Sequence, residues 1–176
     1  MEDRSGWLKD LIRDIPDFPR PGVGFKDITP LLADPKAFAG TVEAMTEPFR
    51  GRRVDKVIGI EARGFIIAAP VALDLGAGFV PVRKAGKLPW SVHAETYELE
   101  YGVDTLEMHL DAVDAGDRVL IVDDVLATGG TAAAVAKMVD HVGAEAVGYS
   151  FILELAFLGG RGRIGDMETF SLVTYE

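Results

Sequence analysis

The segment VLIVDDVLATGGTAAAV, residues 119–135, constrains the fold of this chain more than any other stretch. Residues 119–122 are all aliphatic, which is typical of a strand buried on both faces of a parallel sheet. The alanine-rich stretch after Thr131 has a high helix propensity. Two glycines, Gly129 and Gly130, separate the strand from this helix. The segment therefore predicts a strand, a glycine loop and a helix, the repeating unit of an α/β fold.

The rest of the chain continues this alternation. From the spacing of apolar residues and from start and stop signals, we expect helices at residues 7–15, 34–49, 65–75 and 132–142. We expect strands at residues 56–60, 78–84, 117–124, 145–155 and 169–176, and two hairpin strands within 96–110. The proline-rich stretch 16–30 predicts an ordered loop. The order predicts one domain, residues 1–176, with an open, mainly parallel twisted sheet flanked by helices on both faces.

Composition narrows the class of protein. The 176 residues are 48% hydrophobic and 26% charged, which fits an ordinary globular domain. No apolar run reaches the roughly 18–20 residues that span a bilayer, and the charged N-terminal stretch lacks the pattern of a secretory signal. Zero cysteines exclude disulfides and catalysis by cysteine. The net charge of −10 argues against nucleic-acid and anionic-membrane partners, so we expect a cytoplasmic enzyme.

The loop after the 119–122 strand has the features of a phosphate site. Gly129 and Gly130 let backbone N–H groups point inward, Thr128 and Thr131 add hydroxyl groups, and the following helix contributes its positive end. The adjacent carboxylates of 123–124 would repel a bare phosphate, so they suit ribose hydroxyls or magnesium-bound water. The chemistry predicts a magnesium-chelated sugar phosphate. The alternatives are a solvated acidic turn and a Walker-type loop, but no G-K-[ST] triplet follows the glycines.

VLIVDDVLATGGT closely resembles the phosphoribosyl pyrophosphate signature of the type I phosphoribosyltransferases. PDFPRPGVGFKDITPLL, GIEARGF, PVRKAGKLP, ETYELEYG and SLVTYE resemble the adenine phosphoribosyltransferase family, so the resemblance covers the chain nearly end to end. It implies the type I fold with an N-terminal hood at about 16–33 and a flexible β-hairpin flap at about 88–110. It also implies purine salvage by a homodimer that converts adenine and phosphoribosyl pyrophosphate to AMP and pyrophosphate with Mg²⁺.

The resemblance assigns the ribose and its 5-phosphate to seven residues. They are Asp123, Asp124, Ala127, Thr128, Gly129, Gly130 and Thr131. Mg²⁺ is expected to be held mainly by the substrate, with water-mediated contacts to the two aspartates and no direct protein ligand. The three histidines have no ligand spacing, so we expect no metal there.

Two further segments are implied to bind pyrophosphate. One is Glu61, Ala62 and Arg63, where the family has a cis peptide between the first two and some members carry Ser in place of Ala62. The other is the basic run of Arg83, Lys84 and Lys87, which the family uses partly across a dimer interface. From the residues alone, any one of these cations is as readily part of a solvated charged loop, but three together at the edge of the switch point favour an anion site.

The catalytic residues implied are Glu100 and Arg63, with Tyr101 beside Glu100 in the flap. A carboxylate there either stabilises an oxocarbenium-like state or takes the proton that adenine loses. Both roles remain open.

The resemblance places adenine against Phe25, with Gly24 and Lys26 reading the base through their backbone and Leu158 as the opposite wall. From the residues alone, Phe25 is more readily a core residue. Two other functions remain possible: a phosphoribosyltransferase for xanthine or another nucleobase, and a non-catalytic regulator that senses phosphoribosyl pyrophosphate.

Overall fold

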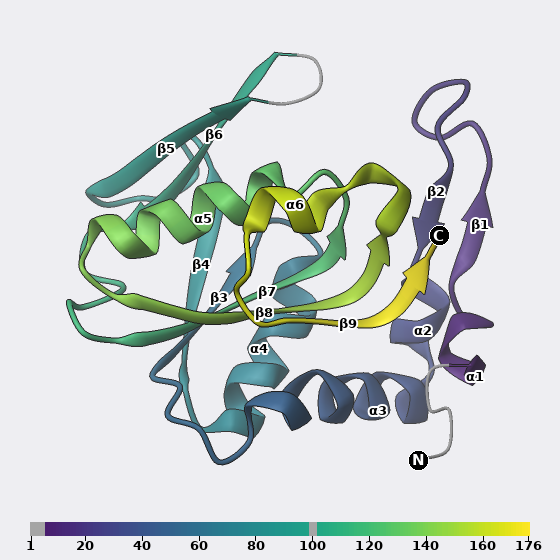
Figure 1. The fold of residues 1–176 in the computed structure, drawn as a ribbon, viewed down its shortest axis with the longest axis horizontal. Coiled ribbons are helices and arrows are strands. Elements are labelled where there is room, and N and C mark those ends of the chain that lie inside the picture. Colours follow the sequence, from purple (N-terminus) through teal and green to yellow (C-terminus); the bar gives the residue numbers. More distant parts are fainter. Residues whose placement is uncertain (1–5, 99–101) are drawn as a thin grey trace.

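The computed structural model describes residues 6–98 and 102–176. Within them, a seven-stranded sheet has the order β5-β6-β4-β3-β7-β8-β9 (Figure 1). Its strands are β3 (Lys56–Ile60), β4 (Gly78–Lys84), β5 (Val92–Glu98), β6 (Val103–His109), β7 (Arg118–Leu126), β8 (Glu145–Leu155) and β9 (Thr169–Tyr175). The pairs β4/β3, β3/β7, β7/β8 and β8/β9 are parallel, and β6 is antiparallel to both β4 and β5. The predicted open, mainly parallel sheet is confirmed.

Helices cover both faces of the sheet (Figure 1). The helical elements are α1 (Gly6–Lys9), α2 (Thr29–Ala33), α3 (Pro35–Thr46), η1 (Glu47–Phe49), α4 (Gly64–Leu75), α5 (Gly130–His141), η2 (Ala156–Leu158) and α6 (Gly160–Ile164). Helices α3 and α4 lie on one face, and α5 and α6 lie on the other. None of these described helices has the length and hydropathy needed to cross a membrane.

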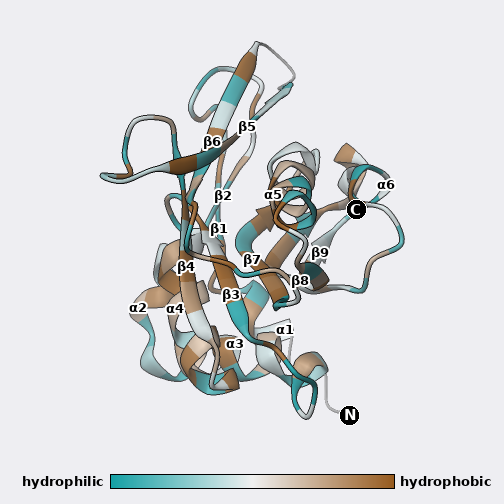
Figure 2. Ribbon diagram, turned by 90° about the vertical axis from the view of Figure 1, so that its left-hand side faces the viewer, coloured by the Kyte–Doolittle hydropathy of each residue, from teal (hydrophilic) through white to brown (hydrophobic). Residues whose placement is uncertain are grey.

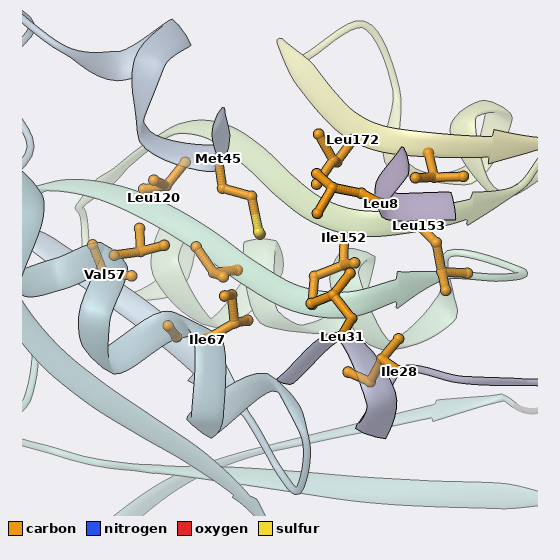
Figure 3. Close-up of a cluster of buried hydrophobic side chains, with 14 of the residues drawn as sticks. Leu8, Ile28, Leu31, Met45, Val57, Ile67, Leu120, Ile152, Leu153 and Leu172 are labelled. Carbon is orange, nitrogen blue, oxygen red and sulfur yellow. The ribbon is translucent and has the colours of Figure 1, made fainter. Parts of the chain in front are cut away.

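The sheet has a separate apolar core on each face. Figure 3 shows the first core, where Met45 of α3 and Ile67 of α4 pack toward Leu120 of β7. The second core joins β3, β4, β7 and β8 to α5 through side chains such as Val135 and Tyr149. In Figure 2, the core strand β3 is largely hydrophobic, whereas the ribbon of β5 and β6 carries both hydrophobic and hydrophilic residues. This follows because the core strands are covered on both faces.

The ends of the helices follow from local sequence. The Asp34 carboxylate accepts hydrogen bonds from the backbone N–H groups of Lys36 and Ala37, and it thereby caps the start of α3. Helix α4 ends at Gly76, whose φ of 67° is the left-handed conformation that glycine adopts without a steric penalty. The expected helix start at Asp34 is therefore confirmed.

The N-terminal region differs from the sequence prediction. The helix expected over residues 7–15 ends at Lys9, and residues Arg13–Ile15 form strand β1. This strand pairs antiparallel with β2 (Phe25–Asp27), and Arg13 forms an ion pair of 3.4 Å with Asp27. The stretch expected to be only an ordered loop thus also contains β2 and α2. The helical spacing was misleading because the apolar positions serve a short helix and then a strand.

The chain order of the strands defines where a ligand site should lie. From β3 the chain passes to β4 on one side, whereas β7 and β8 lie on the other side of β3. The strand order therefore switches between β3 and β7. Ligands in open α/β sheets bind at the carboxyl ends of the strands beside such a switch.

Candidate active site

A pocket of about 300 Å³ opens at the carboxyl ends of β3, β4 and β7. The residues that line it are Ile60, Glu61, Ala62, Arg63, Lys84, Tyr97, Asp104, Leu106, Asp123, Asp124 and Thr131. The sequence placed most of these polar residues at strand ends, and the fold brings them together as expected. Tyr97 and Asp104, from the β5/β6 hairpin, were missed because nothing in the sequence distinguishes them from other strand residues.

The phosphate loop, residues 127–131, connects β7 to α5 and lines an adjoining cavity of about 120 Å³. Gly129 has a φ of 78°, and a Cβ atom there would lie 2.5 Å from the carbonyl oxygen of Gly160. A Cβ atom on Gly160 would in turn lie 2.2 Å from the carbonyl oxygen of Ala127. The loop is therefore packed against the start of α6, and Gly160 is a site residue that the sequence prediction missed. The only signal was the Gly159–Gly160 pair.

The acidic pair at the end of β7 is held in place by close contacts. The backbone N–H of Asp124 donates a hydrogen bond of 2.9 Å to Oδ1 of Asp123. Gly64 makes room for that carboxylate, since a Cβ atom at Gly64 would lie 2.5 Å from the same oxygen. Burial and the neighbouring Asp124 carboxylate raise the pKa of Asp123. Burial also raises the pKa of Asp124, and the Arg63 guanidinium opposes that rise. This is an electrostatically costly pair that packing alone does not require.

Arg63 links the acidic pair to the N-terminal region. Its Nε atom lies 2.7 Å from Oδ2 of Asp124, which is only 5% exposed. Its guanidinium also lies over the Phe25 ring, 4.7 Å from the ring centroid. Phe25 makes an edge-to-face contact with Phe18 at 5.0 Å. Phe25 is not one of the residues that line the 300 Å³ pocket, but it contacts Arg63, which does line it.

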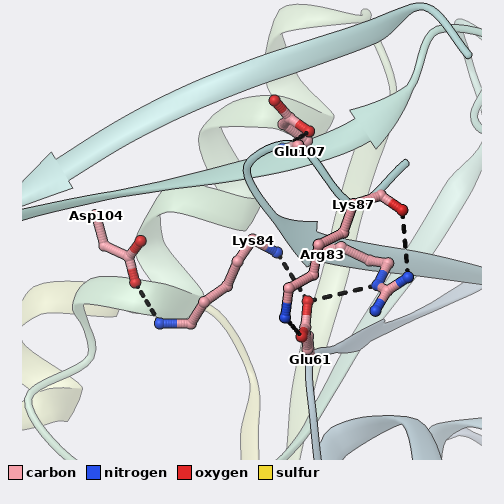
Figure 4. A network of polar contacts seen from close by, with 7 residues as sticks. Glu61, Arg83, Lys84, Lys87, Asp104 and Glu107 are labelled. Carbon is pink, nitrogen blue, oxygen red and sulfur yellow. Dashed lines mark hydrogen bonds and ion pairs between the residues drawn. The ribbon is translucent and has the colours of Figure 1, made fainter. Parts of the chain in front are cut away.

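Glu61 contacts all three residues of the basic run at the end of β4, Arg83 and Lys87 through their side chains and Lys84 through its backbone (Figure 4). Its carboxylate contacts the Lys87 ammonium, accepts a hydrogen bond of 3.0 Å from the Lys84 backbone N–H, and lies 3.4 Å from Arg83 Nε. Hydrogen bonds from Lys87 and from the Lys84 backbone, together with the Arg83 guanidinium, hold the pKa of Glu61 below its usual range. The cis peptide that the resemblance implied between Glu61 and Ala62 is present. The basic run is therefore ordered around one carboxylate.

The other residues expected to bind adenine lie on different elements, Lys26 on β2 and Leu158 on η2. The Lys26 ammonium contacts the Asp14 carboxylate and lies 3.9 Å from the centroid of the Tyr175 ring. Its side chain is thus engaged away from the pocket, which leaves its backbone for recognition. Leu158 is in η2 with 42% of its surface exposed. Glu100 and Tyr101 lie outside the described residues.

The pocket combines three kinds of chemistry. Carboxylates at its centre accept hydrogen bonds from hydroxyl groups, the glycine loop on one side offers N–H donors to an anion, and the cations after β4 offer a second anion site. A ligand that suits this order is a diol with a phosphate at each end. The pocket volume also lies within the range of small-molecule sites.

Known proteins share both the sequence and the fold. Residues 29–158 match the phosphoribosyl transferase domain family. Adenine phosphoribosyltransferase from Anaeromyxobacter dehalogenans is 58% identical over 96% of this chain and 98% of its own length. The structure of the Rhodothermus marinus adenine phosphoribosyltransferase is 51% identical and has a TM-score of 0.94, covering 97% of this chain and 98% of that one.

A second structure, the Saccharomyces cerevisiae adenine phosphoribosyltransferase complexed with an imino-altritol bisphosphate and adenine, is 41% identical with a TM-score of 0.90. It covers 96% of this chain and 97% of that one. These likenesses extend over nearly the whole chain, and the matched region contains the acidic pair and the phosphate loop. The chain therefore belongs to the phosphoribosyltransferase family, among the adenine phosphoribosyltransferases.

Proposed function

We propose that this chain transfers the phosphoribosyl group of phosphoribosyl pyrophosphate to adenine, giving AMP and pyrophosphate. One observation carries the proposal: two adjoining cavities that share Asp123 and Thr131 bring together the Asp123–Asp124 pair, the glycine loop, Arg63 and Lys84. This order matches the diol, the 5-phosphate and the pyrophosphate of that substrate. The relatives named adenine phosphoribosyltransferase support adenine as the acceptor.

The phosphate loop and the acidic pair hold the ribose 5-phosphate end. Backbone N–H groups at Ala127, Thr128, Gly129 and Gly130, with the hydroxyls of Thr128 and Thr131, surround the phosphate at the start of α5. The carboxylates of Asp123 and Asp124 accept hydrogen bonds from the ribose hydroxyls. Burial raises the pKa of both acids, and hydrogen bonds from the ribose diol would offset the cost of keeping them charged in the pocket.

The leaving pyrophosphate occupies the opposite side of the pocket. Its partners are the backbone of Glu61 and Ala62 and the side chains of Arg63, Arg83, Lys84 and Lys87. All three cations after β4 already have carboxylate partners, Glu61 or Asp104. When pyrophosphate binds, its oxygens therefore replace the Glu61 and Asp104 carboxylates as partners of these cations.

Adenine lies against Phe25, between the backbone of Gly24 and Lys26 and the side chain of Leu158. The Arg63 guanidinium covers one face of the Phe25 ring. A base that stacks on that face replaces Arg63, which is then available to the pyrophosphate. This exchange connects base binding to the leaving-group site through one residue.

During transfer, the bond from the anomeric carbon to pyrophosphate breaks, a bond to adenine N9 forms, and adenine loses a proton. Arg63 offsets the charge that develops on the leaving group. We assign Glu100, with Tyr101 beside it, to the positive anomeric centre or to the departing proton. The hairpin that carries them would close over the pocket and exclude water.

Mg²⁺ fits this site as a substrate-bound ion. Asp124 is committed to Arg63, and Asp123 accepts the Asp124 backbone N–H, so neither carboxylate is a free direct ligand. The described residues hold no group of three or more metal-ligating side chains. Water-mediated contacts to Asp123 and Asp124 would complete the shell of an ion whose charge offsets that of the phosphates.

We also propose a cytoplasmic homodimer. Three large apolar side chains on neighbouring elements are exposed: Ile66 and Leu73 of α4 and Phe79 of β4. Exposed apolar side chains on neighbouring elements of one region support an interface there. The lack of cysteine suits a reducing compartment.

A panel of bases tests the proposal. Incubation with phosphoribosyl pyrophosphate, Mg²⁺ and adenine, hypoxanthine, guanine or xanthine should give nucleotide fastest with adenine. Faster conversion of another base would contradict the assignment of adenine. Tight sequence-specific DNA binding without nucleotide formation would instead indicate a regulator.

A further inference from the structure

The two pocket residues of the hairpin, Tyr97 of β5 and Asp104 of β6, form a cross-strand pair. Directly paired residues of antiparallel strands share one face of the ribbon, and here that face lines the pocket. The neighbouring pair, Thr96 and Thr105, lies on the opposite face, where its hydroxyls are 2.9 Å apart. The hairpin thus directs one tyrosine and one aspartate at the phosphate-binding groups.

Each member of this pair holds a proposed phosphate ligand. Thr131 of the phosphate loop donates a hydrogen bond of 3.3 Å to the Tyr97 hydroxyl. The Lys84 ammonium lies 2.6 Å from Oδ2 of Asp104 (Figure 4). The two contacts therefore attach the turn end of the hairpin to both ends of the pocket.

The pair is also connected within itself. The Lys84 ammonium holds the pKa of Asp104 below its usual range, and a hydrogen bond from the Tyr97 hydroxyl adds to this effect. The Asp104 carboxylate in turn raises the pKa of Lys84. Tyr97 is 9% exposed, so its hydroxyl has little access to bulk water. A polar chain thus runs from Thr131 through Tyr97 and Asp104 to Lys84.

We propose that Tyr97 and Asp104 are positioning residues for phosphoribosyl pyrophosphate. They hold Thr131 and Lys84 in place and release them to the two phosphate ends of the substrate when it binds. The inference rests on the function proposed above and extends it to residues of the hairpin.

Simple hydrogen-bond and charge arguments require this exchange. A threonine hydroxyl has one proton to donate, so Thr131 donates either to Tyr97 or to a phosphate oxygen. Lys84 has three N–H donors, but a pyrophosphate beside it would also face the negative Asp104 carboxylate. Repulsion between these like charges favours movement of Asp104 away from β4.

Because one chain of contacts joins both ends, ligands at the two ends should bind cooperatively. A phosphate at Thr131 frees Tyr97, which weakens the attachment of Asp104 to Lys84. A pyrophosphate at Lys84 then displaces a less firmly held carboxylate. Such coupling is reciprocal. Either ligand should therefore raise the affinity for the other more in the wild type than in a variant whose Thr131–Tyr97–Asp104–Lys84 contacts are broken.

Titration calorimetry with two probes, ribose 5-phosphate and inorganic pyrophosphate, each with Mg²⁺, tests the inference. The quantity to compare is the ratio of pyrophosphate dissociation constants without and with saturating ribose 5-phosphate. We expect this ratio to be about two- to fivefold smaller in Tyr97→Phe than in the wild type. We also expect Asp104→Asn to bind pyrophosphate alone about two- to fivefold more tightly, since the competing charge is removed.

Thr96→Val is the matched control, because it removes a hydrogen bond from the outer face of the same hairpin. It should leave both quantities at wild-type values. Equal ratios in wild type and Tyr97→Phe, or an equal change in Thr96→Val, would overturn the positioning role. Failure of the wild type to bind either probe would overturn the proposed function and this inference with it.

Discussion

Arg63 forms an ion pair with Asp124 in which Nε lies 2.7 Å from Oδ2. Asp124 is almost fully buried, whereas a third of the Arg63 side chain is exposed. A buried carboxylate with one mobile cationic partner is suited to exchange that partner for a ligand. This arrangement underlies the first prediction.

We predict that Asp124→Asn weakens phosphoribosyl pyrophosphate binding by about 1.5–3 kcal/mol, the value of a hydrogen bond to a charged group. Titration calorimetry with phosphoribosyl pyrophosphate measures the change in binding free energy. Asp140→Asn, at the exposed end of α5, is the control and should bind normally. Unchanged affinity in Asp124→Asn would remove this residue from the ribose site.

Asp123→Asn should stabilise the protein while it impairs binding. The pKa of Asp123 is raised on folding, so its contribution to the free energy of unfolding is fully present below the unfolded-state pKa and is lost as pH rises through the folded-state pKa. At neutral pH the carboxylate of Asp123 therefore lowers the free energy of unfolding. Thermal unfolding of Asp123→Asn should show a higher Tm at pH 7 than the wild type and little difference at low pH. A lower Tm at pH 7 would contradict the raised pKa.

Phe25→Ala should raise the KM for adenine without changing the affinity for phosphoribosyl pyrophosphate. Loss of stacking on an aromatic ring costs about 1–3 kcal/mol per base. Phe18→Ala, which removes only the edge contact to Phe25, is the comparison and should have a smaller effect. Steady-state kinetics with each substrate varied separately distinguishes the two. Equal effects on both substrates would indicate that Phe25 is a packing residue.

Gly160→Ala should damage the phosphate loop from outside it. The added methyl group would lie 2.2 Å from the Ala127 carbonyl oxygen, so the loop must shift. We expect a loss of about 1–3 kcal/mol in ribose 5-phosphate binding, as for other overpacked sites. Gly162→Ala lies in the same helix with no atom within 4 Å of its Cβ position, and it should bind normally. Normal binding by both variants would show that the loop does not depend on this contact.

Glu100→Gln should lower kcat more than it changes KM, because the proposed contact strengthens in the transition state. Steady-state rates with saturating substrates measure this. A pH–rate profile that loses its acidic limb would favour proton transfer, and an unchanged profile would favour electrostatic stabilisation. A variant with the wild-type rate would exclude Glu100 from catalysis.

The sequence predicted the elements whose signals are local. The apolar strand that carries Asp123 and Asp124, the Asp34 cap and the glycine turn into α5 each have a local signal, and the structure contains all three. The strand runs on to Leu126 and the helix begins at Gly130, two residues beyond and two residues before the expected positions. The start of the chain was mispredicted, because the pairing of β1 with β2 joins residues such as Arg13 and Asp27 that are far apart in the sequence. Local periodicity contains no information about such a partner.

The site residues that the sequence predicted are those placed by the order of the strands. Asp123 and Asp124 lie near the carboxyl end of β7 and Arg63 follows β3, so the topology rule places them at the ligand site. Tyr97 and Asp104 sit within an ordinary alternating hairpin, and Gly64 and Gly160 matter only through the atoms that a Cβ would meet. Their roles depend on distances between elements, which a single sequence does not show.

Simultaneous quantification of AMP and pyrophosphate from adenine, phosphoribosyl pyrophosphate and Mg²⁺ tests the proposed function most directly. The wild type should form the two products in equal amounts. The double variant Asp123→Asn/Asp124→Asn should be at least about a hundredfold slower at low substrate concentration, as two lost charge-assisted contacts require. Absence of AMP from the wild type, or equal rates in the wild type and the double variant, would contradict the account.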